Sequence, residues 1–311
     1  MSTQTPNDPK NPSINSAKPQ RGPSGLYEFL RDLDRRVIFS LMALAVAVPI
    51  LLQITPPEKA TPIVRDAFET IEALEEGDRV YMAFDFDPAS AGELQPMATA
   101  FVRHACEKKL KIYFTALWPV GPQFIKNAER DVISRDFPDM VYGEDYVDLG
   151  FKTGNEGVIK LVANDLRTQY PQDARGTPID DIPMMEGVAS IRDFDVIMNV
   201  SAGYPGTKEW VQYAVASAPD DVKLVAGCTG VQAPLLYPYY PQQMSGLLAA
   251  IKGAAEYESL VLGKYGRENE PGMYQEGLRR MAPQLSGHIL MVGLIFVGNL
   301  VYFMARKRGE A

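Results

Sequence analysis

The chain has 311 residues, of which 46% are hydrophobic and 23% are charged, a mixture typical of globular domains. Its formal net charge of −8 argues against a nucleic-acid partner, because proteins that bind nucleic acids usually present a basic face. The chain has only two histidines, His104 and His288, which leaves little room for the usual Ser–His, Cys–His and His-rich zinc sites.

The first segment of the chain is predicted to be a disordered tail. Residues 1–25 are rich in Pro, Ser, Asn and Gly and nearly free of large apolar side chains. Such a segment cannot bury enough surface to offset the entropy lost on ordering. Residues 26–36 follow as a short amphipathic lead-in, because Leu26, Phe29, Leu30 and Leu33 share one helical face.

Two uncharged apolar runs are predicted to be transmembrane helices. Residues 37–54 and residues 288–305 each contain 18 residues without a formal charge. A helix needs about 20 apolar residues to cross the hydrocarbon core of a bilayer. A buried core helix is the alternative for both runs, and a cleaved signal peptide is a further alternative for the first. Neither run has the polar face of an amphipathic helix, which favours membrane spans.

Basic residues outside the two runs predict the orientation. Arg31, Arg35 and Arg36 precede the first run, and residues 306–311 begin with Arg306, Lys307 and Arg308. The positive-inside rule then places both termini in the cytoplasm. Residues 55–280 are consequently expected outside it, in the periplasm, in the extracellular space or, in a eukaryote, in a lumen.

Between the predicted spans, helical runs alternate with short runs rich in β-branched and aromatic residues. This alternation predicts a doubly wound, mainly parallel α/β sheet of the Rossmann-like or flavodoxin-like kind, inserted between two transmembrane helices. Pro96 is expected in the first turn of its helix or at the end of a preceding one. Residues 171–187 form a long irregular connection, which is usually functional or mobile. The predicted strands cover residues 79–86, 111–118, 146–151, 193–202 and 222–230, and the predicted helices cover residues 61–77, 91–109, 121–137, 155–170, 207–218 and 242–266.

Ligands of such a sheet bind beyond the carboxyl ends of its strands. The first strand ends in "FDFDPAS", and its two carboxylates, Asp85 and Asp87, are candidates for catalysis and for holding a divalent cation. The alternative is structural, because "DPAS" is also a good turn and helix N-cap sequence. No other cofactor is indicated.

The stretch "FDFDPAS" resembles the opening of phosphatases of the haloacid dehalogenase type. That resemblance implies a nucleophile at Asp85 and an acid/base at Asp87. It departs from the pattern at Ala89, where the family has Thr or Ser. In the family's order there follow a hydroxyl at Thr115, a lysine at Lys152 or Lys160, and an acidic pair at Asp180 and Asp181.

A second candidate site lies in the stretch "SAGYPGTKEW", which follows the predicted strand at residues 193–202. Its glycines permit close approach of the backbone, and the next helix begins with free N–H groups that favour an anion. A plain strand-to-helix turn is the alternative. The ligand-binding candidates are Ser201, Gly203, Tyr204, Gly206, Thr207 and, after the next predicted strand, Thr229.

Candidate interface residues follow in the last third of the chain. "YPYYP" places Tyr237, Tyr239 and Tyr240 on a backbone expected to be stiff and extended, and the helix predicted after it carries small residues that allow close approach. These residues are expected either to pack on the domain's own sheet or to contact a neighbouring subunit, and the tyrosines alternatively line a pocket. The remaining interface candidates are Gly246, Gly253 and, within the second apolar run, Asn299.

These features favour a non-enzymatic role over an enzymatic one. The leading hypothesis is a scaffold or assembly subunit of a larger, homo- or hetero-oligomeric membrane complex. The alternatives are a small-molecule or anion-binding module with its site at the strand ends, and a metal-dependent phosphohydrolase using Asp85 and Asp87. Whether Cys106 and Cys228 pair is left open by the sequence.

Overall fold

A computed structural model describes residues 25–56, 58–218, 222–266 and 275–309, and these residues divide into two units. One unit lies within residues 45–286 and contains the α/β fold. The other comprises residues up to 44 and from 287 onward, and its described parts are helical. The predicted disordered tail lies outside the described residues except for Gly25, which begins helix α1 (Gly25–Arg31).

Six parallel strands form a single sheet in the order β3-β2-β1-β4-β5-β6, which confirms the predicted α/β class. Strand β1 has β2 on one side and β4 on the other, with Tyr81 opposite both Tyr113 and Ile197. The strand order therefore reverses between β1 and β4, where α/β folds commonly bind ligands. The strands are β1 (Arg79–Asp85), β2 (Lys111–Ala116), β3 (Tyr146–Phe151), β4 (Val196–Ser201), β5 (Lys223–Cys228) and β6 (Gly246–Ala249).

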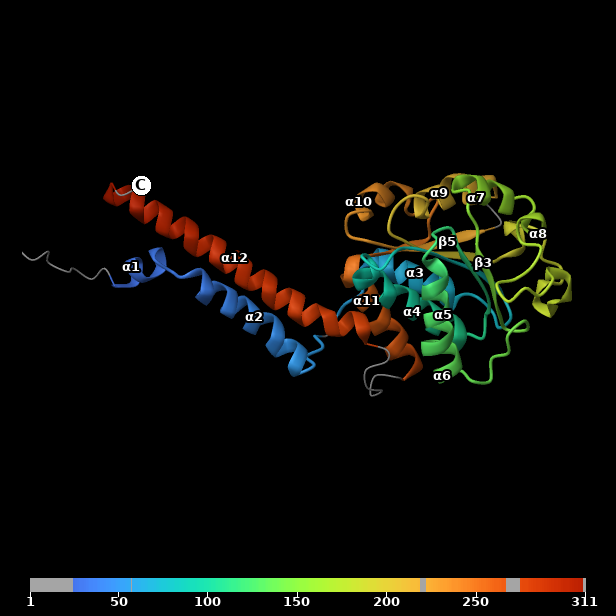
Figure 1. The fold of residues 1–311 in the computed structure, drawn as a ribbon, viewed down its shortest axis with the longest axis horizontal. Coiled ribbons are helices and arrows are strands. Elements are labelled where there is room, and N and C mark those ends of the chain that lie inside the picture. Colours follow the sequence, from blue (N-terminus) through green and yellow to red (C-terminus); the bar gives the residue numbers. More distant parts are fainter. Residues whose placement is uncertain (1–24, 57, 219–221, 267–274, 310–311) are drawn as a thin grey trace, which may run out of the picture. The chain divides into compact units, whose positions relative to one another are not determined.

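Helices cover both faces of the sheet (Figure 1). Side chains alternate along each strand, so Val80 and Phe84 enter one core while Tyr81 and Ala83 enter the other. The first core is covered by α3 (Pro62–Glu72), α4 (Ala91–Glu107), α5 (Gly121–Ala128), η1 (Glu129–Ile133), α6 (Ser134–Asp136) and α11 (Ala250–Tyr265). The second is covered by α7 (Glu156–Val162), α8 (Leu166–Gln169), α9 (Thr207–Glu209), η5 (Trp210–Ala214), η6 (Val215–Ser217) and α10 (Ala233–Leu236).

The two cysteines lie on opposite faces of the sheet. Cys106 belongs to the core under α4, and Cys228 belongs to the core on the other face. Both are buried and free. The two cysteines therefore form no disulfide, a point that the sequence left open.

The helix predicted for residues 242–266 is wrong in its first part. Residues Gly246–Ala249 form strand β6, and the helix, α11, starts only at Ala250. A Cβ atom added to Gly246 would lie 2.4 Å from the Cα of Ala67, so α3 packs directly against this strand. The segment before it is not extended as predicted either, because η7 (Tyr237–Tyr239) is a turn of 3₁₀ helix.

The prediction for Pro96 is also wrong, because α4 continues from Ala91 through Pro96 to Glu107. Proline has no N–H group, so it leaves the carbonyl of Gly92, four residues earlier, without its helical partner. The Nη1 atom of Arg280 donates a hydrogen bond to that carbonyl. A side chain distant in the sequence thereby compensates for a proline inside the helix.

The long connection at residues 171–187 is held in place by side chains of β1 and β2, which donate hydrogen bonds to its carbonyl groups. It contains two 3₁₀ turns, η2 (Ile179–Asp181) and η3 (Pro183–Met185), and η4 (Ile191–Asp193) follows. Arg79, the first residue of β1, donates to the Glu186 carbonyl at 2.9 Å, and the Tyr113 hydroxyl donates to the Met184 carbonyl. These contacts hold the connection against the amino ends of the strands.

Helix α11 holds the segments by which the chain enters and leaves the α/β fold. The Glu256 carboxylate accepts hydrogen bonds from the N–H and hydroxyl groups of Thr61, at 2.8 and 2.7 Å. The Glu258 carboxylate accepts from the N–H groups of Gly277 and Leu278, at 2.9 and 3.0 Å. Both glutamates are buried.

Among the described residues, α12 (Glu276–Arg308) is the one helix that is long and apolar enough to cross a membrane. It contains the predicted span at residues 288–305. Helix α2 (Arg35–Leu51) has 17 residues and contains most of the first predicted span, but it ends before Ile54. The first span and the topology therefore remain predictions.

Candidate functional site

Asp85 lies at the carboxyl end of β1, where the strand order reverses, and it is completely buried. Its Oδ1 atom accepts a hydrogen bond from the Leu117 N–H group at 2.7 Å. Its Oδ2 atom accepts from the Asn199 side-chain amide at 2.8 Å and from the Trp210 indole at 3.1 Å. One carboxylate thus accepts hydrogen bonds from three separate segments: the residue after β2, strand β4 and helix η5.

The loop after β4 adds a second layer to these contacts. The Thr207 hydroxyl donates to the Asn199 side-chain oxygen at 2.6 Å and lies 2.9 Å from the Ser201 hydroxyl. The Thr207 N–H group donates to the Ser201 hydroxyl at 3.0 Å. These hydrogen bonds connect five buried residues, which are called the Asp85 network below: Asp85, Asn199, Ser201, Thr207 and Trp210. Two predicted ligand-binding residues, Ser201 and Thr207, therefore bind other parts of the protein.

Burial raises the pKa of Asp85 to about 6, and the three donors around the carboxylate only partly offset this effect. The side chain is consequently ionised at neutral pH. With both oxygens bound to protein donors and no exposed surface, the carboxylate links three strands rather than presenting a free nucleophile.

Asp87 has a different structural role from Asp85. It is partly exposed, and its Oδ1 atom accepts a hydrogen bond from the Ser90 N–H group at 2.9 Å. This bond closes the turn between β1 and α4. The N-cap of α4 is Ser90, whose side chain makes no capping bond. The geometry of Asp87 matches the structural alternative that the sequence offered for "DPAS".

The other residues of the phosphatase resemblance do not complete a site around Asp85. The Thr115 hydroxyl is buried and has no hydrogen-bond partner among the described residues. Lys152 and Lys160 lie over tyrosine rings, with their Nζ atoms 5.2 Å from the centroid of Tyr170 and 4.2 Å from that of Tyr213, respectively. No group of three or more His, Cys, Asp or Glu side chains suited to a metal occurs in the described ranges.

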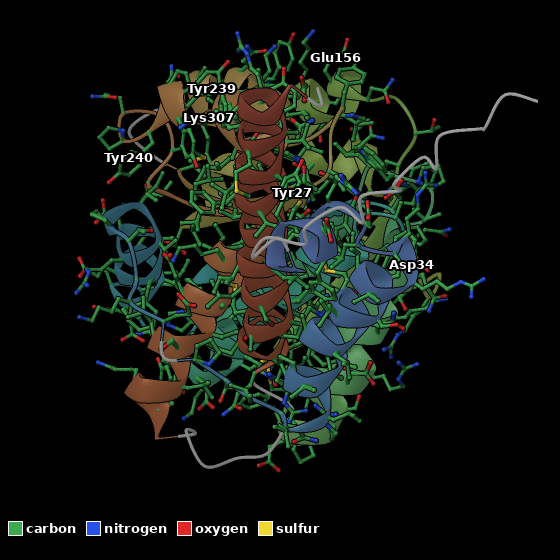
Figure 2. All side chains as sticks on the ribbon, turned by 90° about the vertical axis from the view of Figure 1, so that its left-hand side faces the viewer. Tyr27, Asp34, Glu156, Tyr239, Tyr240 and Lys307 are labelled. Carbon is green, nitrogen blue, oxygen red and sulfur yellow. The ribbon has the colours of Figure 1, made fainter. Side chains whose placement is uncertain are left out.

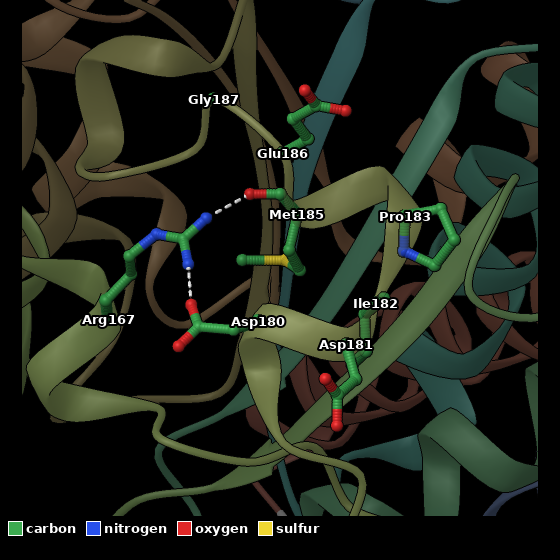
Figure 3. Close-up of a pocket in the computed structure, with 8 residues that line it drawn as sticks. All are labelled: Arg167, Asp180, Asp181, Ile182, Pro183, Met185, Glu186 and Gly187. Carbon is green, nitrogen blue, oxygen red and sulfur yellow. Dashed lines mark hydrogen bonds and ion pairs between the residues drawn. The ribbon is translucent and has the colours of Figure 1, made fainter.

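The acidic pair is held in the long connection instead. Figure 3 shows the Arg167 guanidinium pointing toward the Asp180 carboxylate and the Met185 carbonyl, to both of which it donates hydrogen bonds. Asp181 lines the same cavity, which has a volume of about 450 Å³. This loop is bound to Arg79 at the amino end of β1, whereas Asp85 ends that strand.

Two glutamates bind the N–H groups that an anion would use near the strand ends. Glu93, in the first turn of α4, accepts a hydrogen bond from the Gly230 N–H group at 2.9 Å. Glu209 accepts from the Gly206 N–H group, also at 2.9 Å. Together with Asp85, these carboxylates disfavour a phosphate or nucleotide, because like charges would be brought close together.

Trp118 lies against the loop that follows β4. Its indole donates to the Pro205 carbonyl at 2.8 Å, and a Cβ atom added to Gly203 would lie 3.6 Å from the ring. Gly206 is equally confined, since an added Cβ atom would lie 2.3 Å from the Gly203 carbonyl oxygen. Gly203 and Gly206 were predicted to leave space for a ligand. The protein's own side chains and backbone occupy that space instead.

The remaining ligand candidates lie nearer the surface. Tyr204 is 57% exposed, and its hydroxyl donates to Glu156. Thr229 acts through its carbonyl, which accepts from the Gln232 and Ala233 N–H groups at the start of α10. The loops of Tyr204 and Gln232 are neighbours, since a Cβ atom on Gly203 would lie 3.8 Å from the Gln232 amide nitrogen.

Four exposed apolar side chains lie on these neighbouring loops, on α10 and just after it, and they are called the exit patch below: Tyr204, Val231, Leu235 and Tyr237. Val231 is the most exposed, at 85%.

The other interface candidates lie elsewhere. Tyr239 and Tyr240 are close together on the α/β unit (Figure 2), and their hydroxyls bind Gln212 and Asp66, respectively. Gly246 and Gly253 are buried within the domain, where an added Cβ atom would lie 2.4 Å from Ala67 or 2.8 Å from the backbone of Leu248. Asn299 is exposed on α12.

His104 is a core residue rather than part of a site. Its Nδ1 atom lies 2.6 Å from the Tyr257 hydroxyl and its Nε2 atom lies 2.9 Å from the Glu72 carboxylate. Burial lowers the pKa of the His104 imidazole, and the Glu72 carboxylate partly offsets this effect. The three side chains connect α3, α4 and α11.

A search of protein-family models and a search of curated protein sequences each found no match to this chain. The sequence did not predict three residues that shape the strand ends: Glu93, Asn199 and Glu209. One signal was available, because Asn199 is the single polar residue inside the apolar run "VIMNV". A polar side chain buried in such a strand requires polar partners.

Proposed function

We propose that this protein is a membrane-anchored scaffold or assembly subunit, whose extracytoplasmic α/β domain contacts other subunits of a larger membrane complex. The observation that carries the proposal is the state of the strand ends. The place where this class of sheet would hold a ligand is filled by the Asp85 network and Trp118.

The filled strand ends favour a structural role for the domain. A catalytic carboxylate must reach a substrate or an attacking water, and Asp85 is buried with both oxygens bound. A bound anion would have to displace Glu93 or Glu209 from the N–H groups that they already occupy. The same edge carries the exposed apolar exit patch, and apolar and aromatic side chains dominate the energetics of protein interfaces.

Membrane anchoring is the second part of the proposal. Helix α12 is long and apolar enough to cross a bilayer, and basic residues follow its apolar stretch. We take α2, with the residues after it, as a second span. With both termini in the cytoplasm, the α/β unit lies outside it. Such a protein would present the exit patch to partners in the extracytoplasmic space.

The proposal predicts that the exit patch holds the complex together. The tagged chain would be extracted with a mild detergent from the membranes in which it is naturally made, and the particle mass would be measured by light scattering. We expect a particle clearly larger than one 34.4-kDa chain with its detergent. Replacing Val231 and Leu235 by lysine should weaken association at least about tenfold, because charges would enter an apolar interface.

The matched control is Val141→Lys, which places the same charge on an exposed valine outside the patch. This variant should assemble like the wild type. A wild-type particle containing a single chain would refute the scaffold proposal. Normal assembly of the Val231→Lys, Leu235→Lys variant would refute the role of the exit patch.

A further inference from the structure

A cavity of about 510 Å³ lies within residues 45–286, where the ends of α2 and α12 meet. One part of its wall is apolar and another part is cationic. Its lining consists of Pro49, Ile50, Gln53, Arg279, Arg280 and Pro283. This cavity is separate from the strand ends and from the exit patch.

The two arginines in the wall differ in their partners. Arg280 donates to the Gly92 carbonyl and to the Glu276 carboxylate, so its guanidinium is engaged. Within the described residues, the Arg279 side chain makes one hydrogen bond, from Nη2 to the Gln53 side-chain oxygen at 3.2 Å, and its Nε atom is buried without a partner. An unsatisfied donor on a charged group is costly. Arg279 therefore has donors available for an anionic oxygen.

The apolar wall identifies the kind of anion. Pro49, Ile50 and Pro283 line the cavity, and Leu51, Leu52 and Leu285 beside them are exposed. A soluble anion would gain nothing from this surface. An amphiphile with an anionic head and apolar chains would use both parts of the wall.

The position of Arg279 along α12 matches the headgroup layer of a bilayer. From Met281 to Ala305 the helix has no Asp, Glu, Lys or Arg. These residues span roughly 38 Å at the helical rise of about 1.5 Å per residue. The hydrocarbon core measures about 30 Å, and about 40–45 Å with the headgroup layers included. If Arg306 lies in one headgroup layer, Arg279 lies in the other.

We propose that this cavity binds a phospholipid of the extracytoplasmic leaflet, with Arg279 binding the phosphate and the apolar wall contacting the glycerol and upper acyl chains. This inference rests on the membrane anchoring proposed above. The planar guanidinium suits a phosphate because two of its N–H groups can donate in parallel.

The test measures lipid retention by native mass spectrometry of the full-length chain extracted from membranes. The probe is phosphatidylglycerol, and diacylglycerol, which lacks the phosphate, serves as the comparison lipid. Arg279→Gln should retain phosphatidylglycerol at least about tenfold less well than the wild type. The matched control Arg65→Gln, at an exposed arginine on α3, should retain it normally. Diacylglycerol should be retained poorly by the wild type and by both variants.

Equal retention of phosphatidylglycerol by Arg279→Gln and Arg65→Gln would overturn the proposal. Displacement of the lipid by millimolar inorganic phosphate, with phosphate bound in its place, would identify a soluble anion as the ligand and overturn it as well. A second variant, Ile50→Gln, removes apolar wall at an exposed position and leaves Arg279 intact. It should also lose lipid, and it provides the test if Arg279→Gln fails to fold.

Alkaline extraction of the membranes separates this inference from the proposed function. A chain that is released into the supernatant would refute the membrane anchoring itself. A chain that stays in the pellet, but whose variants all retain lipid equally, would refute only the lipid site.

Discussion

Asp85 shows how much the role of a residue depends on its surroundings. In the sequence it is an acid at the end of an apolar strand, next to a second acid, and this pattern suggests a metal or phosphoryl site. In the structure, three donors from separate segments bind its two oxygens. The position of Asp85 at the strand end was predictable. Its partners were not, because Leu117, Asn199 and Trp210 are distant from it in the sequence.

We predict that Asp85→Asn destabilises the α/β unit by about 1–3 kcal/mol, the usual cost of leaving buried hydrogen-bonding groups without partners. An asparagine has one acceptor oxygen and an NH₂ group, so it cannot accept from the donors on both sides of the carboxylate. Denaturant unfolding monitored by tryptophan fluorescence would measure the change.

The control for this substitution is Asp87→Asn. Asp87 is partly exposed, and an asparagine oxygen can still accept from the Ser90 N–H group, so its stability should stay within about 0.5 kcal/mol of the wild type. Equal stability of Asp85→Asn and the wild type would contradict the structural role of Asp85.

Single elements were predictable where local pattern and tertiary context agree. Strands β1 to β5 are buried on both faces, so their sequences are nearly continuous apolar runs such as "RVYMAF". Strand β6 has only the residues "GLLA", which fit a helix equally well, and it is a strand because it pairs with β5 and packs against α3. The sequence contains no local signal for that contact.

Pro96 and Arg280 are predicted to be energetically coupled. Arg280→Gln should destabilise the α/β unit by about 1 kcal/mol, because the Gly92 carbonyl loses its donor. Pro96→Ala restores the backbone N–H group for that carbonyl, so Arg280→Gln should cost less in that background. A double-mutant cycle of unfolding free energies gives the coupling directly. Additive effects would show that the arginine does not compensate for the proline.

At the scale of the α/β unit, buried acids govern the response to pH. Burial raises the pKa of Asp85 and Asp148 to about 6, of Glu129 to about 7 and of Glu258 to about 8. In each case the folded-state pKa lies above that of the unfolded chain. The folded state therefore binds more protons in this range, and stability is lost as the pH rises through the folded-state values.

We predict that the α/β unit is more stable at pH 5 than at pH 8. His104 acts in the opposite direction, because burial lowers its pKa and its contribution is lost as the pH falls, but four carboxyl groups oppose this single imidazole. Denaturant unfolding at fixed ionic strength across this range would measure the slope. Stability that rises steadily from pH 5 to pH 8 would contradict the prediction.

The two glutamates of α11 hold both ends of the α/β unit on one helix. Glu256 binds the chain at Thr61, and Glu258 binds it at Gly277 and Leu278, so the chain enters and leaves beside the same helix. A domain whose ends reach one element can be transferred into other chains with little distortion. A segment from Thr61 to Arg280 keeps both contacts as well as the hydrogen bond from Arg280 to the Gly92 carbonyl, so we expect this domain to be a portable module that a different anchor could carry.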